Sequence, residues 1–115
     1  MIADGPTSTS QERRLAHRLR VNIKTHWESK SKRRDGVILD LSQKGCFIVT
    51  PDEIPVGATI TVEVGLPKML HMTLEGIAIR HSKGRGVGVR FKDLTPTQQM
   101  LLMKLIRSIV QQRLK

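Results

Sequence analysis

The chain has 115 residues, of which 38% are hydrophobic and 3% aromatic, a size that fits a single domain with one modest core. No apolar run approaches the ~20 residues that cross a bilayer, the N-terminus has no apolar export signal, and the single cysteine, Cys46, has no disulfide partner. We therefore expect a cytoplasmic protein without a transmembrane segment. Twenty Lys and Arg against ten Asp and Glu give a formal net charge of +10, which favours an anionic partner: nucleic acid, a nucleotide, anionic lipid or an acidic protein.

Most of this charge lies in the first third of the chain. Residues 11–34 hold nine basic and two acidic side chains, or 9 − 2 = +7. Residues 1–11 are rich in Gly, Pro, Ser and Thr and are predicted to form a flexible N-terminal arm. The folded domain is predicted to span 12–115.

Alternating apolar and polar residues predict three strands in the first half of the domain. The first strand places Leu19, Val21, Ile23, Thr25 and Trp27 on one face. The Asp35-Gly36 pair then predicts a hairpin turn, with the basic residues of 30–34 at its solvated tip. Beyond the turn, the inward faces of the next two strands are predicted to be formed by Val37, Leu39 and Leu41, and then by Phe47 and Val49.

Three further strands and a helix are predicted in the second half. Ile60–Leu66 and 87–91 alternate regularly, whereas the strand from Leu70 to Arg80 changes its apolar phase near Gly76, which indicates a bulge or bend there. Thr95 is predicted to cap a helix over 96–113 whose apolar residues form one stripe. The predicted fold is therefore mainly β: a six-stranded antiparallel barrel over about 18–93, closed by a C-terminal α-helix.

Two short motifs stand out within this pattern. Arg13, Arg14 and Arg18 form RRxxxR, and Asp40, Ser42 and Gly45 form DxSxxG about 20 residues later. The second motif alone is typical of a polar strand end followed by a turn. In this order and strand context, however, the two motifs together resemble the PilZ domain, the bacterial receptor module for cyclic di-GMP. The resemblance covers roughly residues 11–114.

The resemblance implies that arginines ahead of the barrel fold over the ligand. A guanidinium can donate two hydrogen bonds to a phosphate or to the O6 and N7 atoms of guanine, and it can stack on a base. Arg14 and Arg18 are accordingly expected to contact phosphate and guanine. Arg13 is expected to pack on a second, stacked ligand copy, which some family members bind, so that one copy or a stacked pair remains open.

The DxSxxG residues are implied to read the ligand at the barrel wall. A carboxylate at Asp40 accepts hydrogen bonds from the guanine N1–H and amino groups, and the Ser42 hydroxyl can donate or accept beside it. Gly45 either adopts a positive φ or allows a close approach to the backbone. Arg80 and Arg90 are weaker candidates for the border of the same site.

Catalytic and metal sites are not predicted. His17, His26, His71 and His81 show no ligand spacing with Cys or carboxylates, and no nucleophile with a base can be supported. We expect a binding protein without a cofactor, not an enzyme. With one domain, it would signal to an unidentified effector protein through a change of its own surface.

Two alternatives stay open beside the cyclic di-GMP receptor. One is a basic β-barrel that binds nucleic acid, although Trp27, Phe47 and Phe91 all fall in the apolar phase and leave no exposed stacking platform. The other is a PilZ-type interaction module that has lost the ligand, against which the intact arginine motif argues. Dependence on Asp40 and on salt would separate these functions.

Overall fold

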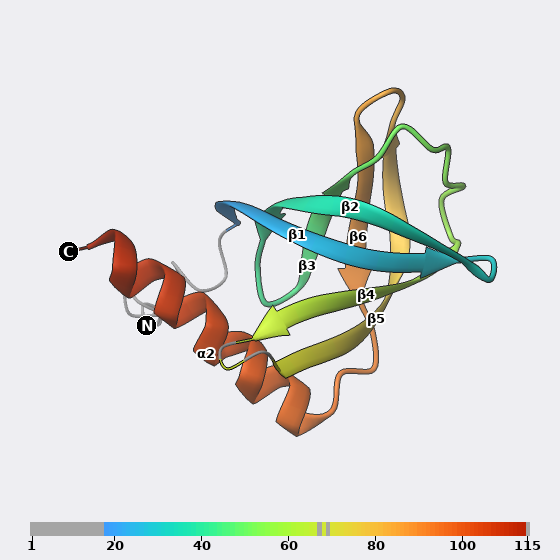
Figure 1. Ribbon diagram of the computed structural model, residues 1–115. Coiled ribbons are helices and arrows are strands. Elements are labelled where there is room, and N and C mark those ends of the chain that lie inside the picture. Colours follow the sequence, from blue (N-terminus) through green and yellow to red (C-terminus); the bar gives the residue numbers. More distant parts are fainter. Residues whose placement is uncertain (1–17, 67, 69, 115) are drawn as a thin grey trace, which may run out of the picture.

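Six antiparallel strands close into a barrel in the computed structural model, which describes residues 18–66, 68 and 70–114. The elements are β1 (Leu19–Ser29), β2 (Lys32–Leu41), β3 (Gly45–Val49), β4 (Thr59–Leu66), β5 (Leu70–Ser82), β6 (Gly86–Phe91) and α2 (Pro96–Arg113). The strands follow one another around the barrel in the order β1-β2-β3-β6-β5-β4, with α2 at one end (Figure 1). The predicted fold class is confirmed. The predicted arm, residues 1–11, and the motif arginines Arg13 and Arg14 lie outside the described residues.

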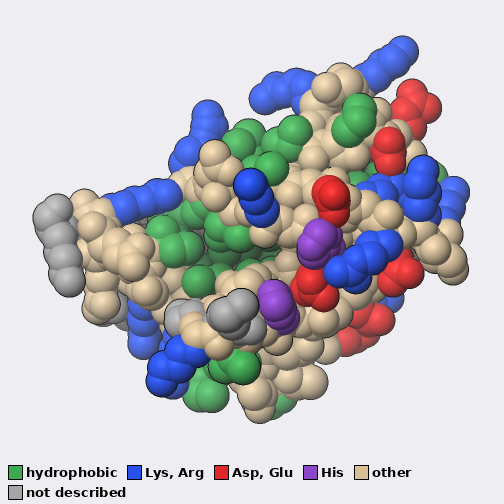
Figure 2. Space-filling view, viewed as in Figure 1, with side chains coloured by type: hydrophobic (Ala, Val, Ile, Leu, Met, Phe, Trp, Pro, Cys, Tyr) green, Lys and Arg blue, Asp and Glu red, His purple; other side chains and the backbone are tan. Residues whose placement is uncertain are grey.

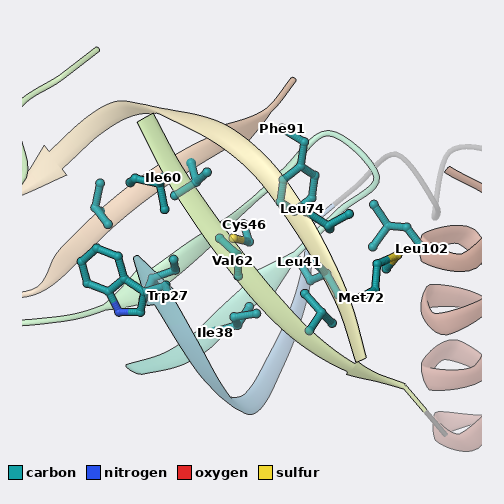
Figure 3. Close-up of a cluster of buried hydrophobic side chains, with 14 of the residues drawn as sticks. Trp27, Ile38, Leu41, Cys46, Ile60, Val62, Met72, Leu74, Phe91 and Leu102 are labelled. Carbon is teal, nitrogen blue, oxygen red and sulfur yellow. The ribbon is translucent and has the colours of Figure 1, made fainter. Parts of the chain in front are cut away.

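The barrel interior is filled from end to end by apolar side chains. Trp27 lies near one end, and Leu102 of α2 lies at the other (Figure 3). The predicted inward face of β1 is confirmed, because Val21, Thr25 and Trp27 are all buried. Burial of each large apolar side chain contributes about 1.5–3 kcal/mol relative to exposure, so this column of residues holds the barrel in one register.

The hairpin between β1 and β2 turns five residues earlier than predicted. Lys30 and Ser31 form the turn with φ angles of 54° and 62°, whereas Asp35-Gly36 lies within β2. Gly36 is needed there because a Cβ atom would lie 2.7 Å from Trp27 Nε1. The same glycine that is typical of a turn therefore permits the close approach of an indole ring.

Only part of the basic run at 30–34 is a solvated hairpin tip. The Arg34 side chain lies 4.9 Å over the Trp27 ring and donates to Asp52 Oδ2 at 2.6 Å. Its Nη1 also donates to the backbone oxygens of Ser29 and Lys32. Arg34 is thus a structural residue of the hairpin.

The inward face of β2 differs from the prediction. Ile38 and Leu41 are fully buried, while Leu39 and Asp40 between them are only partly buried. The reason is a register shift between Ile38 and Asp40 in the β2–β3 pairing. One extra residue at a bulge moves every later side chain to the other face.

The inward face of β3 was also predicted incorrectly. Cys46 and Ile48 have no exposed surface and belong to the core cluster, whereas Val49 is 38% exposed. Phe47 is buried but lies outside the core cluster, as expected for a residue on the outer wall. The prediction failed because every side chain from Cys46 to Val49 is apolar, so alternation could not identify the inner face.

The bulge of β5 lies further along than predicted. Met72, Leu74, Gly76 and Ala78 keep one unbroken inward phase, and the register shifts between Ala78 and Arg80. Gly76 is instead required by crowding, since a Cβ atom would lie 2.7 Å from a carbonyl oxygen of β6.

The C-terminal helix has the predicted bounds and cap. The Thr95 side chain accepts a hydrogen bond from the Gln98 amide at 3.1 Å, and the Gln98 side chain accepts one from the Thr95 amide at 2.9 Å. Leu102 and Ile106 are fully buried against the barrel. Within the described part of the chain, no helix combines the length and the apolar character that crossing a membrane requires.

The buried Cys46 thiol is expected to be unreactive in the folded protein. Burial, assisted by the nearby Asp40 carboxylate, raises the pKa of Cys46 from 9.0 to about 12, so the nucleophilic thiolate is absent at neutral pH. The folded state loses stability as the pH rises from 9.0 towards about 12, because over this range the Cys46 thiol ionises in the unfolded chain but not in the folded protein. Ellman's reagent at pH 8 should label the chain in guanidinium but not in buffer. Rapid labelling in buffer would contradict the buried position.

Candidate ligand-binding site

Strand register lines up five residues across five neighbouring strands. Arg20 of β1 is opposite Asp40 of β2, and Asp40 is opposite Phe47 of β3. Phe47 is in turn opposite Gly88 of β6, and Gly88 is opposite Arg80 of β5. Directly opposed residues share a face of the sheet, and Arg20 and Arg80 are exposed. The row therefore runs around the outer wall of the barrel, and the Arg80 side chain lies 3.6 Å from where a Cβ atom at Gly88 would be.

Bulges next to this row aim its polar residues outward. Register shifts occur beside Arg20 in the β1–β2 pairing, beside Asp40 in β2–β3 and beside Arg80 in β5–β6. A bulge reorients the following side chain without ending the strand. The same irregularities that interrupt the core pattern thus bring two arginines and one carboxylate to one surface.

A cavity of about 260 Å³ lies over the row, lined by Arg20, Leu39, Asp40, Phe47, Arg80, Ser82 and Arg85. Arg18 adds a fourth guanidinium, because its Nη1 lies 3.7 Å from Asp40 Oδ1. Four guanidinium groups against one carboxylate leave a local charge of 4 − 1 = +3. The cavity suits an anion that also carries hydrogen-bond donors for the carboxylate.

The Asp40 carboxylate has unused hydrogen-bonding capacity. Its Oδ1 atom is buried and accepts no hydrogen bond from the described residues, since 3.7 Å to Arg18 is an ion pair without a hydrogen bond. A buried acceptor without a donor costs about 1–3 kcal/mol. The Asp40 carboxylate can therefore accept a hydrogen bond from a further donor at this cavity.

Ser42 supports the turn after β2 and does not line the cavity. Its side chain is buried, and its hydroxyl oxygen accepts hydrogen bonds from the Lys44 amide at 3.1 Å and the Gly45 amide at 3.2 Å. The hydroxyl is therefore occupied within the motif, so contact between Ser42 and a guanine remains a prediction.

Gly45 allows a close approach, one of its two predicted roles. The described residues with positive φ do not include it. A Cβ atom at Gly45 would overlap the carbonyl oxygen of Val89, across the β3–β6 pairing. The backbone that approaches Gly45 belongs to the protein itself.

The two weaker candidates separate in the structure. Arg80 lines the cavity beside Asp40. Arg90, opposite Gly45 in the register, lines a different cavity together with Lys44 and Met103. The structure therefore brings Arg18, Asp40 and Arg80 together and does not bring Arg90 to them.

The sequence motifs do not predict five of the residues that line the cavity: Arg20, Leu39, Phe47, Ser82 and Arg85. Arg20 lay in the arginine-rich segment but outside the RRxxxR spacing, and Arg85 in a glycine-rich turn. Phe47 was predicted to point into the core, yet it lines the cavity. The Phe47 ring therefore forms part of the cavity wall, which the apolar–polar alternation of the sequence did not predict.

An arginine-lined recess that contains one carboxylate thus lies on the wall of a closed six-stranded barrel. The sequence model of the PilZ domain matches residues 12–109. The chain therefore belongs to the PilZ domain family, as the two motifs indicated. No curated protein sequence matches it.

Solved structures agree with this fold. The PilZ domain of CeSA from a cellulose-synthesizing bacterium superposes with a TM-score of 0.66 at 21% identity, covering 81% of this chain and 97% of that one. The inhibitor of motility MotI/DgrA of Bacillus subtilis gives 0.69 at 16% identity, over 85% of this chain and 50% of that one. PlzA of Borreliella burgdorferi, solved in complex with c-di-GMP, gives 0.62 at 15% identity, over 80% and 40%. The last two are longer proteins that this chain matches only in part.

Proposed function

We propose that this protein is a cytoplasmic, non-enzymatic receptor for cyclic di-GMP that binds the ligand at the Asp40 cavity. The observation that carries the proposal is the buried Asp40 Oδ1 atom, which accepts no hydrogen bond from the described residues and lies within a group of four guanidiniums. A second support is family membership, together with a similar structure, PlzA, that is a c-di-GMP complex.

The cavity chemistry matches a guanine nucleotide. The N1–H and amino group of guanine are donors that a carboxylate accepts, while O6, N7 and the phosphates are acceptors that guanidiniums bind. Phe47 and Leu39 offer an apolar surface to a base. Arg20, Arg80 and Arg85 line the same cavity and are proposed to bind the phosphates or the outer edge of the base.

The size of the cavity supports a role for the residues ahead of β1. At about 260 Å³ it falls below the roughly 300–1,000 Å³ typical of sites that bury a small molecule. It can hold a guanine and a neighbouring phosphate, but the rest of the dinucleotide would have to be contacted by residues that do not line the cavity. Arg14, four residues before Arg18, is proposed to supply that cover, and Arg13 to contact a second ligand copy where a stacked pair binds.

Signalling would follow from the closure of this segment over the barrel. Ordering it hides one surface and creates another, which changes the affinity for an effector protein. Among the described residues, no three His, Cys, Asp or Glu side chains gather in a way that could hold a metal ion.

Calorimetric titration tests this function. Cyclic di-GMP should bind with a Kd in the micromolar range or tighter, or about −8 to −10 kcal/mol, and cyclic di-AMP at least about tenfold more weakly, because adenine lacks the N1–H and amino pattern that Asp40 accepts. The stoichiometry distinguishes one copy from a stacked pair. Absence of heat at ~100 μM ligand would exclude the function. Steeply salt-dependent binding of single-stranded DNA in its place would favour a nucleic-acid-binding barrel.

A further inference from the structure

The barrel has a weak seam between β1 and β4. These strands pair at three positions only, His26–Glu28 with Thr61–Glu63, whereas β4 pairs with β5 along its whole length. Residues 21–24 of β1 consequently have no strand partner on the β4 side within the part of the chain that the structure describes, while the Thr25 hydroxyl donates to the Glu63 backbone oxygen of β4. An unpaired strand edge presents backbone donors and acceptors to any extended chain that reaches it.

A continuous groove follows this seam to the helix. Two hollows of about 520 and 350 Å³ adjoin at Gly65, which lines both. The smaller one is walled by Val21 and Ile23 of β1 and by Leu105 and Ile109 of α2. Figure 2 shows this face of the molecule, where hydrophobic side chains gather in a depression between β1 and the helix. The groove is therefore largely apolar and accessible.

The charges around the groove favour an acidic occupant. Lys24 lines one part and Arg113 the other, and the chain has no acidic residue from Pro96 onward. Of the two acids of the larger hollow, Glu63 forms an ion pair with Arg33 at 3.4 Å, and Asp35 is hydrogen-bonded to the His26 ring at 2.7 Å. A second copy of this chain, with its net charge of +10, is a poor match by comparison.

We propose that the seam groove, formed by β1, β4 and α2, is a docking site for an extended, acidic segment of a partner protein. The segment pairs with the edge of β1 at residues 21–24. Its apolar side chains enter the groove beside Ile23 and Ile109, and its carboxylates face Lys24 and Arg113. This is strand addition, in which backbone hydrogen bonds give affinity and alternate side chains give specificity.

The groove is also connected to the candidate ligand site. The Arg113 guanidinium at the end of α2 donates a hydrogen bond to the backbone oxygen of Arg20, and the Arg20 side chain lines the Asp40 cavity. A partner that engages Arg113 therefore acts on the backbone that positions Arg20. This coupling, unlike docking itself, rests on the proposed cyclic di-GMP function, and it must be reciprocal.

A fluorescein-labelled peptide of alternating Glu and Val, eight residues long, serves as the probe for fluorescence anisotropy. It should bind the full-length protein without cyclic di-GMP, and the matching Lys–Val peptide should bind at least about tenfold more weakly. Gly65→Leu should reduce acidic-peptide binding at least tenfold, because a Cβ at Gly65 meets no described atom within 4 Å and the added side chain fills the groove without disturbing the fold. Val49→Leu, on the opposite wall, is the matched control and should change nothing.

Several results would overturn the docking site. These are absence of acidic-peptide binding at ~1 mM, equal binding of the basic peptide, or unchanged binding by Gly65→Leu. Self-association in sedimentation that Gly65→Leu abolishes would assign the groove to a second copy, and tighter binding of a peptide of residues 1–17 would assign it to the chain's own N-terminal segment.

Saturating cyclic di-GMP should shift peptide affinity at least about threefold in wild type but not in Arg113→Ala. If the acidic peptide and cyclic di-GMP both bind to wild type but neither changes the affinity of the other, the proposed coupling is wrong. If cyclic di-GMP does not bind, only the ligand function fails.

Discussion

Asp40→Asn is expected to weaken cyclic di-GMP binding at least about 100-fold, because two charge-assisted hydrogen bonds worth about 1.5–3 kcal/mol each are lost. The substitution keeps the size of the side chain but replaces one acceptor oxygen by an NH2 donor, which then faces donors on guanine. Stability should stay within about 1 kcal/mol of wild type, because the Arg18–Asp40 pair is partly exposed and Oδ1 accepts no hydrogen bond from the described residues. Asp40 is thus predicted to serve binding and not folding.

Asp52→Asn is the matched control, because it should have the opposite effects. Asp52 lies outside the cavity and holds Arg34 at 2.6 Å, which in turn lies over the core residue Trp27. Urea unfolding should show a loss of about 1–2 kcal/mol for Asp52→Asn, while calorimetry shows an unchanged Kd. If Asp40→Asn binds within threefold of wild type, the carboxylate does not read the ligand and the proposed site is wrong.

Periodicity predicted the elements correctly but could not predict which residues face the ligand. A strand can be recognised from its alternation, and the helix from its spacing and the Thr95 cap. A bulge, in contrast, adds one residue without a distinctive sequence, as between Ile38 and Asp40. Because one residue reverses the two faces, Leu39 is predicted to lie in the core although it lines the cavity. Phe47 also lines the cavity, and its predicted position is wrong for a different reason: every side chain from Cys46 to Val49 is apolar.

Strand register explains why Arg80 lines the Asp40 cavity and Arg90 does not. Arg80 and Arg90 both occupy exposed strand positions and look equivalent in the sequence. Pairing places Arg80 opposite Gly88, in the row that contains Asp40, and Arg90 opposite Gly45, near the helix. Long-range pairing of this kind is a tertiary property, so motif spacing could identify Asp40 and Arg18 but could not add Arg20 or Arg85.

The motif glycine has the second large expected effect: Gly45→Ala should lower the free energy of unfolding by at least about 2 kcal/mol. Its Cβ atom would overlap the Val89 carbonyl oxygen, which is main chain and cannot rotate away as a side chain would. Relief requires β3 and β6 to separate where they are hydrogen-bonded. Gly65→Ala is the control, and it should change stability by less than about 0.5 kcal/mol, because a Cβ there meets no described atom within 4 Å.

Measuring both stability and ligand affinity distinguishes the two reasons for a glycine in DxSxxG. If Gly45 serves the fold, Gly45→Ala loses stability in urea while the folded protein binds cyclic di-GMP within about threefold of wild type, since Asp40 and the arginines keep their places. If Gly45 instead leaves room for the ligand, affinity falls and stability is retained. The buried position of Gly45 against β6 supports the first outcome. If the stability of Gly45→Ala equals that of wild type, β3 and β6 can separate at little cost in free energy. Gly45 would then be assigned to the ligand-binding site and not to the fold.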